Sequence, residues 1–282
     1  MCNCSRSMPK RRLDTLLAER GLFASRTRAA ASVMAGEVRL GMGQRRAEKA
    51  GEMVDEGELV TLATRPGYVS RGGIKLANAL AASGLEVSGR RALDVGASTG
   101  GFTDCLLQRG AREVIAVDVG YGTLDYSLRV DPRVLVMERT NARALTPALI
   151  AQAASTTTDP PDLATIDVSF ISLEKVLGAV IGCLGAGYDV LALVKPQFEV
   201  GRGRVGKGGV VRDSAERREA LLGVGRAALG LGAAVLGYYS SGLPGPKGNR
   251  ESFIWLADPG LEHGVGASDE EELEALAREV EP

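Results

Sequence analysis

Apolar residues near the start of the chain follow the spacing of short helices and strands. Residues 13–20 place apolar side chains on one face of a helix that ends at a glycine, and residues 25–36 predict a second helix with Ser25 as its N-cap. Residues 37–40 and 58–62 have the pattern of short strands. Together these elements predict a small α+β domain.

From residue 91 onward, buried apolar runs alternate with helical patterns. Strand-like runs lie at residues 91–95, 113–117, 134–138, 163–167, 190–194, 233–240 and 253–256. Strands that alternate with crossover helices predict an α/β fold with a Rossmann-like, doubly wound and mostly parallel sheet, and the last two runs predict an antiparallel hairpin at one edge. The predicted boundaries are residues 1–9 for a disordered N-terminus, 10–62 for the small domain, 63–70 for a linker, 71–260 for the sheet domain and 261–282 for an acidic tail.

Charge separates the two ends of the chain, although the formal net charge is only −1. Residues 1–50 carry eleven lysines and arginines against four carboxylates, whereas residues 262–282 carry eight carboxylates against one arginine. A basic head of this kind favours a polyanionic partner such as a nucleic acid.

Cysteine and histidine usage gives no sign of a metal site or of secretion. Cys2 and Cys4 lack further ligands nearby, and the single histidine, His263, lies in the acidic tail. The two other cysteines lie in apolar segments, as expected for a reduced, cytoplasmic protein, and the first residues lack the apolar core of a signal peptide. We expect no membrane association.

A glycine-rich segment follows the first predicted strand of the sheet. Residues 93–102 read LDVGASTGGF, and their glycines let the backbone approach a ligand at the start of the next helix. A carboxylate at Asp94 disfavours a pyrophosphate but suits the cationic amino-acid end of S-adenosylmethionine. The segment therefore predicts S-adenosylmethionine as cofactor, although a plain strand–turn–helix corner is the alternative. The binding candidates here are Asp94, Gly96, Ser98, Thr99, Gly100 and Gly101.

The next strand ends supply two further candidates for the cofactor. Asp118 ends the second predicted strand, where a carboxylate can accept both ribose hydroxyls. Asn141 follows the third strand and is placed to touch an adenine edge. Three such signals at three successive strand ends are more specific than one glycine-rich turn.

Asp167 and Lys195 end the fourth and fifth predicted strands. In a doubly wound sheet both ends lie over one cleft, so we expect the two side chains to face each other across the cofactor's methyl group. A lysine at the end of an apolar run is unusual because burial opposes its charge. A solvated lysine just beyond the strand is the non-functional alternative.

The strand ends also indicate which atom is methylated. Carbon-5 methylation of cytosine needs a cysteine nucleophile, and neither strand end carries one. Exocyclic-amine methylation usually shows Asp/Asn-Pro-Pro-Tyr after the fourth strand, whereas the Asp-Pro-Pro at residues 159–161 precedes it. A lysine held by a carboxylate can orient a ribose 2′-hydroxyl, stabilise the developing alkoxide and accept its proton.

These motifs resemble those of the TlyA-type rRNA 2′-O-methyltransferases, also called haemolysin A-like proteins, which join an S4-type RNA-binding domain to an FtsJ-like methyltransferase domain. The resemblance extends from Arg12 to about Pro259. It is carried by YVSRGGIKL (68–76), LDVGASTGGFT (93–103), AVDVGYG (116–122), DVSFIS (167–172), LVKPQFE (193–199) and GPKGNRE (245–251).

The resemblance implies a catalytic tetrad and a substrate. The tetrad comprises Lys75, Asp167, Lys195 and Glu251. Lys195 would be the base or hydroxyl-orienting residue, Asp167 would hold it near the sulfonium, and the other two would position the ribose. The implied substrate is a cytidine ribose in 16S or 23S rRNA, or in both, with ribosomal subunits as partners.

The resemblance also makes the basic N-terminal unit an S4-type domain. Its candidates for salt-dependent contacts to RNA phosphates are Arg12, Arg26, Arg28, Arg39 and Lys49. A solvated charged face is the alternative for any one of them. The basic loop at residues 201–209 could cover the RNA entrance.

Two other functions are weighed against the enzyme. A membrane-active haemolysin predicts a secretion signal or an amphipathic lytic segment, and neither is evident. A nonenzymatic RNA-binding or ribosome assembly factor predicts a damaged tetrad or cofactor loop, whereas all four tetrad positions are filled. The sequence therefore favours the enzyme.

Overall fold

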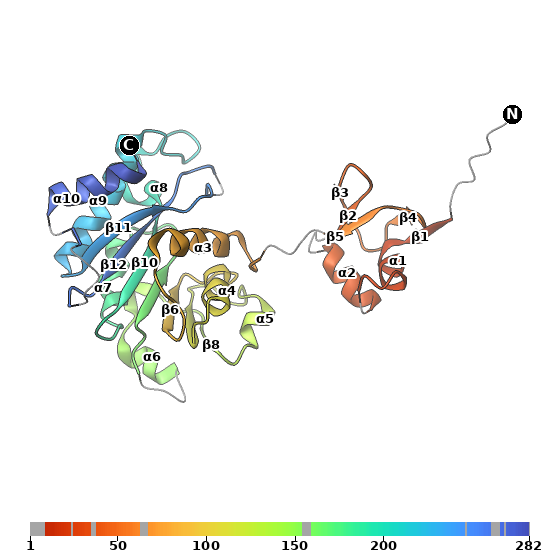
Figure 1. Ribbon diagram of the computed structural model, residues 1–282, viewed down its shortest axis with the longest axis horizontal. Coiled ribbons are helices and arrows are strands. Elements are labelled where there is room, and N and C mark those ends of the chain that lie inside the picture. The colour runs from red at the N-terminus through yellow and green to blue at the C-terminus, as the bar shows by residue number, and fades with distance from the viewer. Residues whose placement is uncertain are drawn as a thin grey trace. The chain divides into compact units, whose positions relative to one another are not determined.

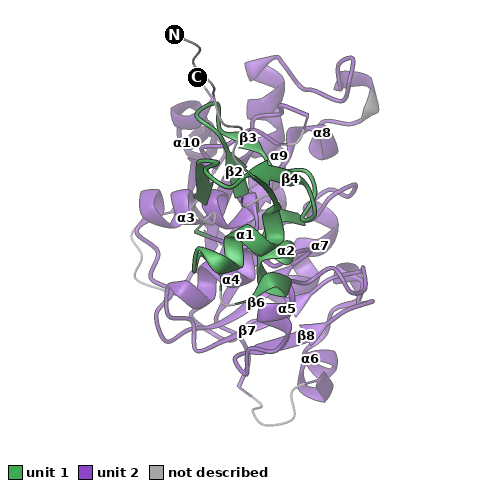
Figure 2. Cartoon of the chain, turned by 90° about the vertical axis from the view of Figure 1, so that its right-hand side faces the viewer, with its two compact units in different colours: residues 1–67 green, residues 68–282 purple. Residues whose placement is uncertain are grey.

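The computed structural model divides into two compact units, Met1–Gly67 and Tyr68–Pro282 (Figures 1 and 2). Each unit has its own hydrophobic core and is described by itself. The structure describes residues 9–23, 25–34, 38–62, 67–153, 159–245, 247–260, 266–267 and 269–281.

The first unit packs two short helices against small antiparallel sheets. Its elements are β1 (Lys10–Arg12), α1 (Leu13–Glu19), α2 (Arg26–Met34), β2 (Val38–Leu40), β3 (Arg45–Arg46), β4 (Met53–Asp55) and β5 (Val60–Leu62). Strand β1 pairs with β4, and β3, β2 and β5 form a second sheet. Leu13, Leu16 and Leu17 recur at helical spacing and are buried, together with Ala29 and Val33 of α2.

The predicted helices and strands of this unit are confirmed, but three further strands are present. The apolar pattern does not predict β1, β3 and β4, which are only two or three residues long. Alternation over so few residues cannot be told from a turn.

A seven-stranded sheet forms the centre of the second unit. Its strands are β6 (Arg91–Val95), β7 (Glu113–Val117), β8 (Val134–Met137), β9 (Leu163–Ile166), β10 (Asp189–Val194), β11 (Ala234–Ser240) and β12 (Ser252–Ala257), in the order β11-β12-β10-β9-β6-β7-β8. Only β12 runs antiparallel to its neighbours β10 and β11. The expected doubly wound sheet with an antiparallel hairpin at one edge is confirmed.

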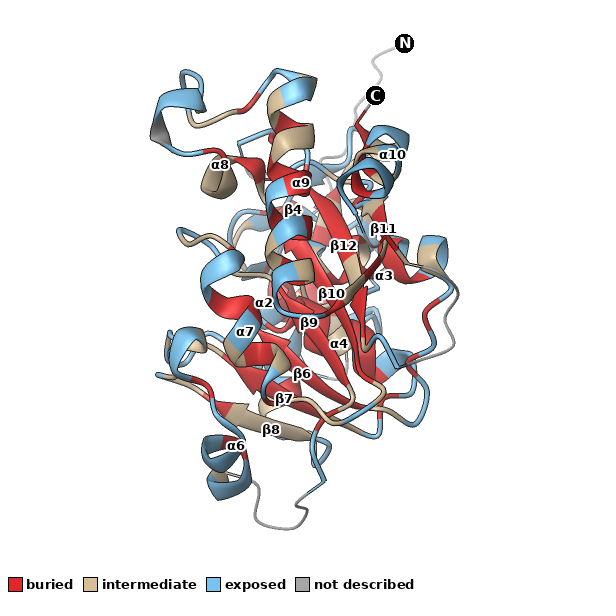
Figure 3. Ribbon diagram, turned by 90° about the vertical axis from the view of Figure 1, so that its left-hand side faces the viewer, coloured by how far each residue is buried: buried red, intermediate tan, exposed pale blue. Residues whose placement is uncertain are grey.

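Helices cover both faces of this sheet; the central strands are buried between them, whereas the edge strand β8 is only partly buried (Figure 3). The helices are α3 (Arg71–Ser83), α4 (Gly101–Gln108), α5 (Tyr126–Arg129), η1 (Ala142–Ala144), α6 (Pro147–Ala153), α7 (Glu174–Ile181), α8 (Pro196–Glu199), η2 (Arg202–Arg204), α9 (Ser214–Gly230) and α10 (Glu270–Val280). Alternation along β6 sends Leu93 and Val95 into the core with α7 and α9, and Ala92 into the core with α3 and α4.

The parallel pairing brings three strand ends together. Ile166 at the end of β9 pairs with Val95 of β6 on one side and with Ala192 of β10 on the other. The residues that follow these strands therefore lie over the same edge of the sheet, which is where ligands bind in folds of this type.

The acidic C-terminal segment forms a helix that packs on the second unit. Leu273 and Ala277 of α10 are buried in the same core as α9 and β11. Glu281, also buried, forms an ion pair with Arg217 of α9 at 2.7 Å. The segment that the sequence marks as an acidic tail is thus anchored by an apolar stripe.

Candidate active site

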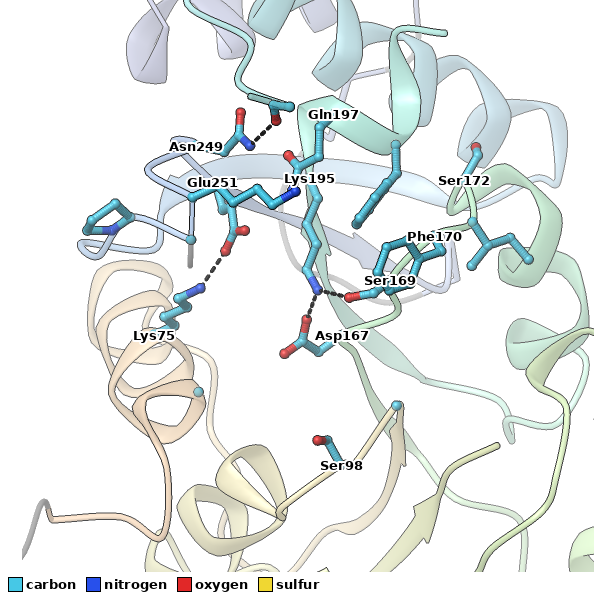
Figure 4. Close-up of a pocket in the computed structure, with 18 of the residues that line it drawn as sticks. Lys75, Ser98, Asp167, Ser169, Phe170, Ser172, Lys195, Gln197, Asn249 and Glu251 are labelled. Atoms are coloured by element: carbon cyan, nitrogen blue, oxygen red, sulfur yellow. Dashed lines mark hydrogen bonds and ion pairs between the residues drawn. The ribbon is translucent and has the colours of Figure 1, made fainter. Parts of the chain in front are cut away.

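A cavity of about 1310 Å³ opens at the carboxyl ends of β6, β9 and β10. Its walls come from the start of α3, the glycine-rich loop after β6, the loop after β9, helix α8 and the loop between β11 and β12. Figure 4 shows the side chains that face it. All of these segments belong to the second unit.

The glycine-rich loop bends closely against its neighbours. Gly96 and Gly100 have φ values of 87° and 94°, and a Cβ atom at Gly96 would lie 2.5 Å from the carbonyl oxygen of Asp167. Ser98 also has a positive φ, and its backbone N–H donates to Oδ2 of Asp118 at 2.8 Å. The loop lines the cavity with Gly96, Ala97, Ser98, Thr99 and Gly101. This open backbone cradle fits a ligand such as S-adenosylmethionine.

Asp94 lies beneath this loop and does not line the cavity. Its carboxyl group is fully buried and accepts hydrogen bonds from the hydroxyls of Thr103 at 2.6 Å and Thr165 at 3.1 Å. Burial raises the pKa of Asp94 to about 7. Its contacts tie β6 to α4 and β9, so Asp94 braces the loop from below.

Asp118 and Asn141 are engaged with nearby backbone. Asp118 accepts the N–H groups of Ser98 and Gly120, the latter at 2.6 Å. Asn141 is exposed and caps η1 by accepting the N–H of Arg143 at 3.0 Å. Neither lines the cavity as the structure shows it, and the same holds for Gly100.

The four tetrad residues line the cavity as two ion pairs (Figure 4). Nζ of Lys195 lies 2.6 Å from Oδ1 of Asp167, although this contact lacks hydrogen-bond alignment. Lys75, from α3, contacts the carboxylate of Glu251, which directly precedes β12. Each carboxylate thus has a lysine as its counter-charge. Lys75 and Glu251, which are 176 positions apart in the sequence, meet at one site.

Ser169 provides a second contact to the active-site lysine. Lys195 donates a hydrogen bond from Nζ to Oγ of Ser169 at 2.9 Å. Asp167 lies against the same nitrogen. The nitrogen of Lys195 is thus held between a hydroxyl and a carboxylate at the wall of the cavity. The sequence reasoning missed Ser169, because its motif does not reveal which side chain turns toward Lys195.

The loop that carries Ser169 is clamped to α8. Phe170 has a φ of 65°, packs on Phe198 with ring centroids 5.2 Å apart, and is 92% exposed. Glu199 accepts the N–H of Leu173 at 3.0 Å, and burial raises its pKa. A large exposed aromatic with a strained backbone is uncommon and is typical of functional sites.

Positive charge dominates the cavity wall. Six cationic side chains line it: Arg71, Lys75, Arg143, Lys175, Lys195 and Lys247. They face two carboxylates, Asp167 and Glu251. Among the described residues, no carboxylate pairs with Lys175 or Lys247. The sequence reasoning missed four of the six, the rim cations Arg71, Arg143, Lys175 and Lys247, because they are distant from one another in the sequence.

The RNA-contact candidates of the first unit lie on its surface. Arg12 and Arg26 both bind the buried carboxylate of Asp14, at 2.9 and 3.1 Å, and remain about half exposed. These hydrogen bonds, that of Arg12 above all, hold the pKa of Asp14 well below its usual range. Arg28 and Lys49 are exposed, and Arg39 is partly buried.

Metal clusters and membrane-spanning helices are both absent from the described residues. No group of three or more histidine, cysteine or carboxylate side chains gathers as a metal site would require. No helix in the described ranges combines the length and apolarity needed to cross a bilayer.

Comparison with known proteins identifies relatives over nearly the whole chain. The sequence model of the FtsJ-like methyltransferases matches residues 68–258. The chain is 50% identical over 248 residues to the 16S/23S rRNA (cytidine-2′-O)-methyltransferase TlyA of Mycobacterium tuberculosis, covering 87% of this chain and 89% of that protein. It is 44% identical over 272 residues to YqxC of Bacillus subtilis, provisionally named an rRNA methyltransferase, covering 96% and 94%.

A solved structure supports the same relationship. The structure from Streptococcus thermophilus, provisionally called a hemolysin, is 40% identical and superposes with a TM-score of 0.70, covering 96% of each chain. The similarity thus includes the first unit as well as the second.

Proposed function

The chain belongs to the FtsJ-like methyltransferase family, and we propose that it methylates the 2′-hydroxyl of a cytidine in ribosomal RNA. As a member of this family it is an enzyme that uses S-adenosylmethionine. The observation that carries the proposal is the pair of Lys195 and Asp167 beside the glycine-rich loop, in a cavity with an excess of positive charge. The name of the relative from M. tuberculosis supports the choice of substrate.

We assign the glycine-rich loop and Asp118 to the cofactor. Backbone of Gly96, Ser98 and Gly101 would lie against its amino-acid end. The carboxylate of Asp118 can still accept ribose hydroxyls, because each oxygen has a further lone pair. When bound, S-adenosylmethionine supplies a methyl group activated by a sulfonium. Asp94 would act indirectly by holding the loop. Asn141 would contact the adenine edge after a small change in the hydrogen bond by which it caps η1.

Lys195 is assigned the central chemical role. Lys195 lines the cavity. In its neutral amine form, its nitrogen would accept a hydrogen bond from the ribose hydroxyl and take up the proton as the oxygen attacks. Asp167 and Ser169 would keep Nζ in place, which preserves the geometry of attack. Lys75 and Glu251 would fix the ribose from the opposite wall.

The protein would hold RNA by contacts to its phosphates and by stacking of a base on an aromatic ring. The rim cations Arg71, Arg143, Lys175 and Lys247 suit the phosphates that flank the target nucleotide. Phe170, exposed at the same cavity, offers a face on which an unstacked base can lie. Both features favour a nucleotide that is turned out of its helix.

We assign residues 10–62 to an S4-type RNA-binding domain, 71–260 to the catalytic domain, and the residues between them to a linker. Arg12, Arg26, Arg28, Arg39 and Lys49 would contact phosphates of rRNA in a ribosomal subunit. With such a substrate, we also propose a cytoplasmic location for the enzyme. Asp14 orients the guanidinium groups of Arg12 and Arg26. This fixed arrangement favours a surface that binds RNA over a charged surface that only contacts water.

Transfer of a tritiated methyl group to purified 30S and 50S subunits, followed by mapping of the labelled nucleotide, tests this function. The expected result is label on the 2′-oxygen of a cytidine. Label on a base would refute the ribose chemistry. Absence of label in both subunits would favour the nonenzymatic RNA-binding alternative.

A further inference from the structure

Two side-chain amides line the cavity, and among the described residues only one of them forms hydrogen bonds within the protein. Asn249 donates to the carbonyl of Gly209 at 2.8 Å and accepts the N–H of Val211 at 2.9 Å, so it braces the loop before α9. Oε1 of Gln197 is buried and has no hydrogen-bond donor among the described residues. The amide of Asn249 therefore stabilises a loop of the protein, whereas the amide oxygen of Gln197 lacks a hydrogen-bond donor.

The tetrad side chains and Ser169, which line the same cavity, are already paired with one another. Lys195 contacts Asp167 and Ser169, and Lys75 contacts Glu251. An unpaired buried acceptor costs stability, so its retention calls for a partner that the chain itself does not supply.

Gln197 lies on the substrate side of the active-site lysine. In Figure 4, Ser98 of the cofactor loop and Gln197 stand at opposite ends of the view, with Asp167 and Nζ of Lys195 between them. Gln197 also directly precedes Phe198, the ring on which Phe170 packs. The free amide is thus next to an aromatic wall and away from the cofactor loop.

We propose that Gln197 reads the hydrogen-bonding edge of the target base, an inference that rests on the proposed function. A primary amide offers one acceptor and two donors in a plane, which matches the adjacent donor and acceptor on the edge of a pyrimidine. Rotation about the last side-chain torsion, which is soft, turns the amide into the cavity. Gln197 is then a specificity-determining residue that contacts RNA.

The replacement Gln197→Leu tests this with opposite effects on stability and activity. Removing an unpaired buried acceptor leaves the denaturation midpoint of the full chain unchanged or raises it, whereas Asn249→Leu, the matched control, lowers it. Methyl transfer to ribosomal subunits by Gln197→Leu falls roughly 10- to 100-fold in kcat/KM, since the base edge loses its partner. The dissociation constant for S-adenosylmethionine stays within twofold.

A second measurement isolates the contact with the base. Subunits whose mapped cytidine is replaced by adenosine are methylated less by the wild type, and this preference shrinks at least tenfold in Gln197→Leu. An unchanged preference, wild-type kcat/KM, or a stability loss like that of Asn249→Leu would overturn the proposal. Failure of the wild type to label any ribose would instead be seen before the variants are compared, and would remove the proposed function together with this inference.

Discussion

At the scale of single residues, the buried carboxyl group of Asp94 links loop geometry to pH. Its pKa of about 7 lies above the ordinary value of 3.8, so between these values the unfolded chain loses this proton while the folded protein keeps it. Stability therefore falls as the pH rises through this window and levels off above about pH 7.

Asp94→Asn removes this dependence, because the amide cannot ionise and can still bond both threonine hydroxyls. Between pH 5 and pH 8, the wild type should lose on the order of 3 kcal/mol more unfolding free energy than the variant. Denaturant unfolding at the two pH values measures the difference. Parallel pH profiles for the two proteins would show that folding does not raise the pKa of Asp94.

Ser169 is predicted to position the lysine rather than to react. In Ser169→Ala, Nζ of Lys195 keeps Asp167 but loses its second anchor, so kcat should fall about tenfold, as for the removal of one hydrogen bond to a charged group. KM for S-adenosylmethionine should stay the same, and Ser169→Thr, which keeps the hydroxyl, should restore most of kcat. Steady-state kinetics on ribosomal subunits would contradict this role if the alanine variant retained full kcat.

At the scale of elements, the sequence predicts the strands that carry the site better than the side chains within it. Buried strands four to six residues long have unmistakable apolar runs, so their order placed Asp167 and Lys195 at one edge of the sheet. Alternation does not reveal that Asp94 turns inward between two threonines. Nor does it reveal an exposed Phe170, whose position depends on a strained loop held by α8.

The C-terminal helix shows the same limit. Its acidic composition gives no indication that Leu273 and Ala277 are buried, or that the carboxylate of Glu281 is buried in an ion pair. The partner of that carboxylate, Arg217, lies 64 residues earlier in α9, and such a distant pair leaves no local signal in the sequence.

Glu281→Ala should therefore destabilise the second unit, because it leaves Arg217 buried without its counter-charge. The expected loss of unfolding free energy is about 3 kcal/mol. Glu279→Ala, which removes an exposed carboxylate of the same helix, should change it by less than about 0.5 kcal/mol. Equal effects in denaturant unfolding would show that the ion pair is not important for docking of α10.

At the scale of the whole molecule, two separate basic surfaces are available for RNA. The first unit carries arginines anchored on Asp14, and the cavity of the second unit has an excess of cations. Each unit has its own core, so the division of labour between docking and catalysis can be tested by separating them.

Deletion of residues 1–62 should weaken binding to ribosomal subunits while the binding of S-adenosylmethionine persists. The truncated protein neutralises fewer phosphates, so its binding should also be less sensitive to salt. The slope of log Kd against log salt should fall by roughly one for each phosphate that is no longer neutralised. Filter binding at several salt concentrations measures both effects. Unchanged affinity and slope would refute a docking role for the first unit.

The most direct test of the account is methyl transfer by Lys195→Ala, because the proposed chemistry converges on this side chain. With tritiated S-adenosylmethionine and the ribosomal subunit that the wild type labels, the rate should fall by at least about 10²-fold, the range for loss of a general base. Equilibrium binding of S-adenosylmethionine should remain within a fewfold of the wild type. Transfer at a rate near that of the wild type would contradict the role given to Lys195 and, with it, the mechanism.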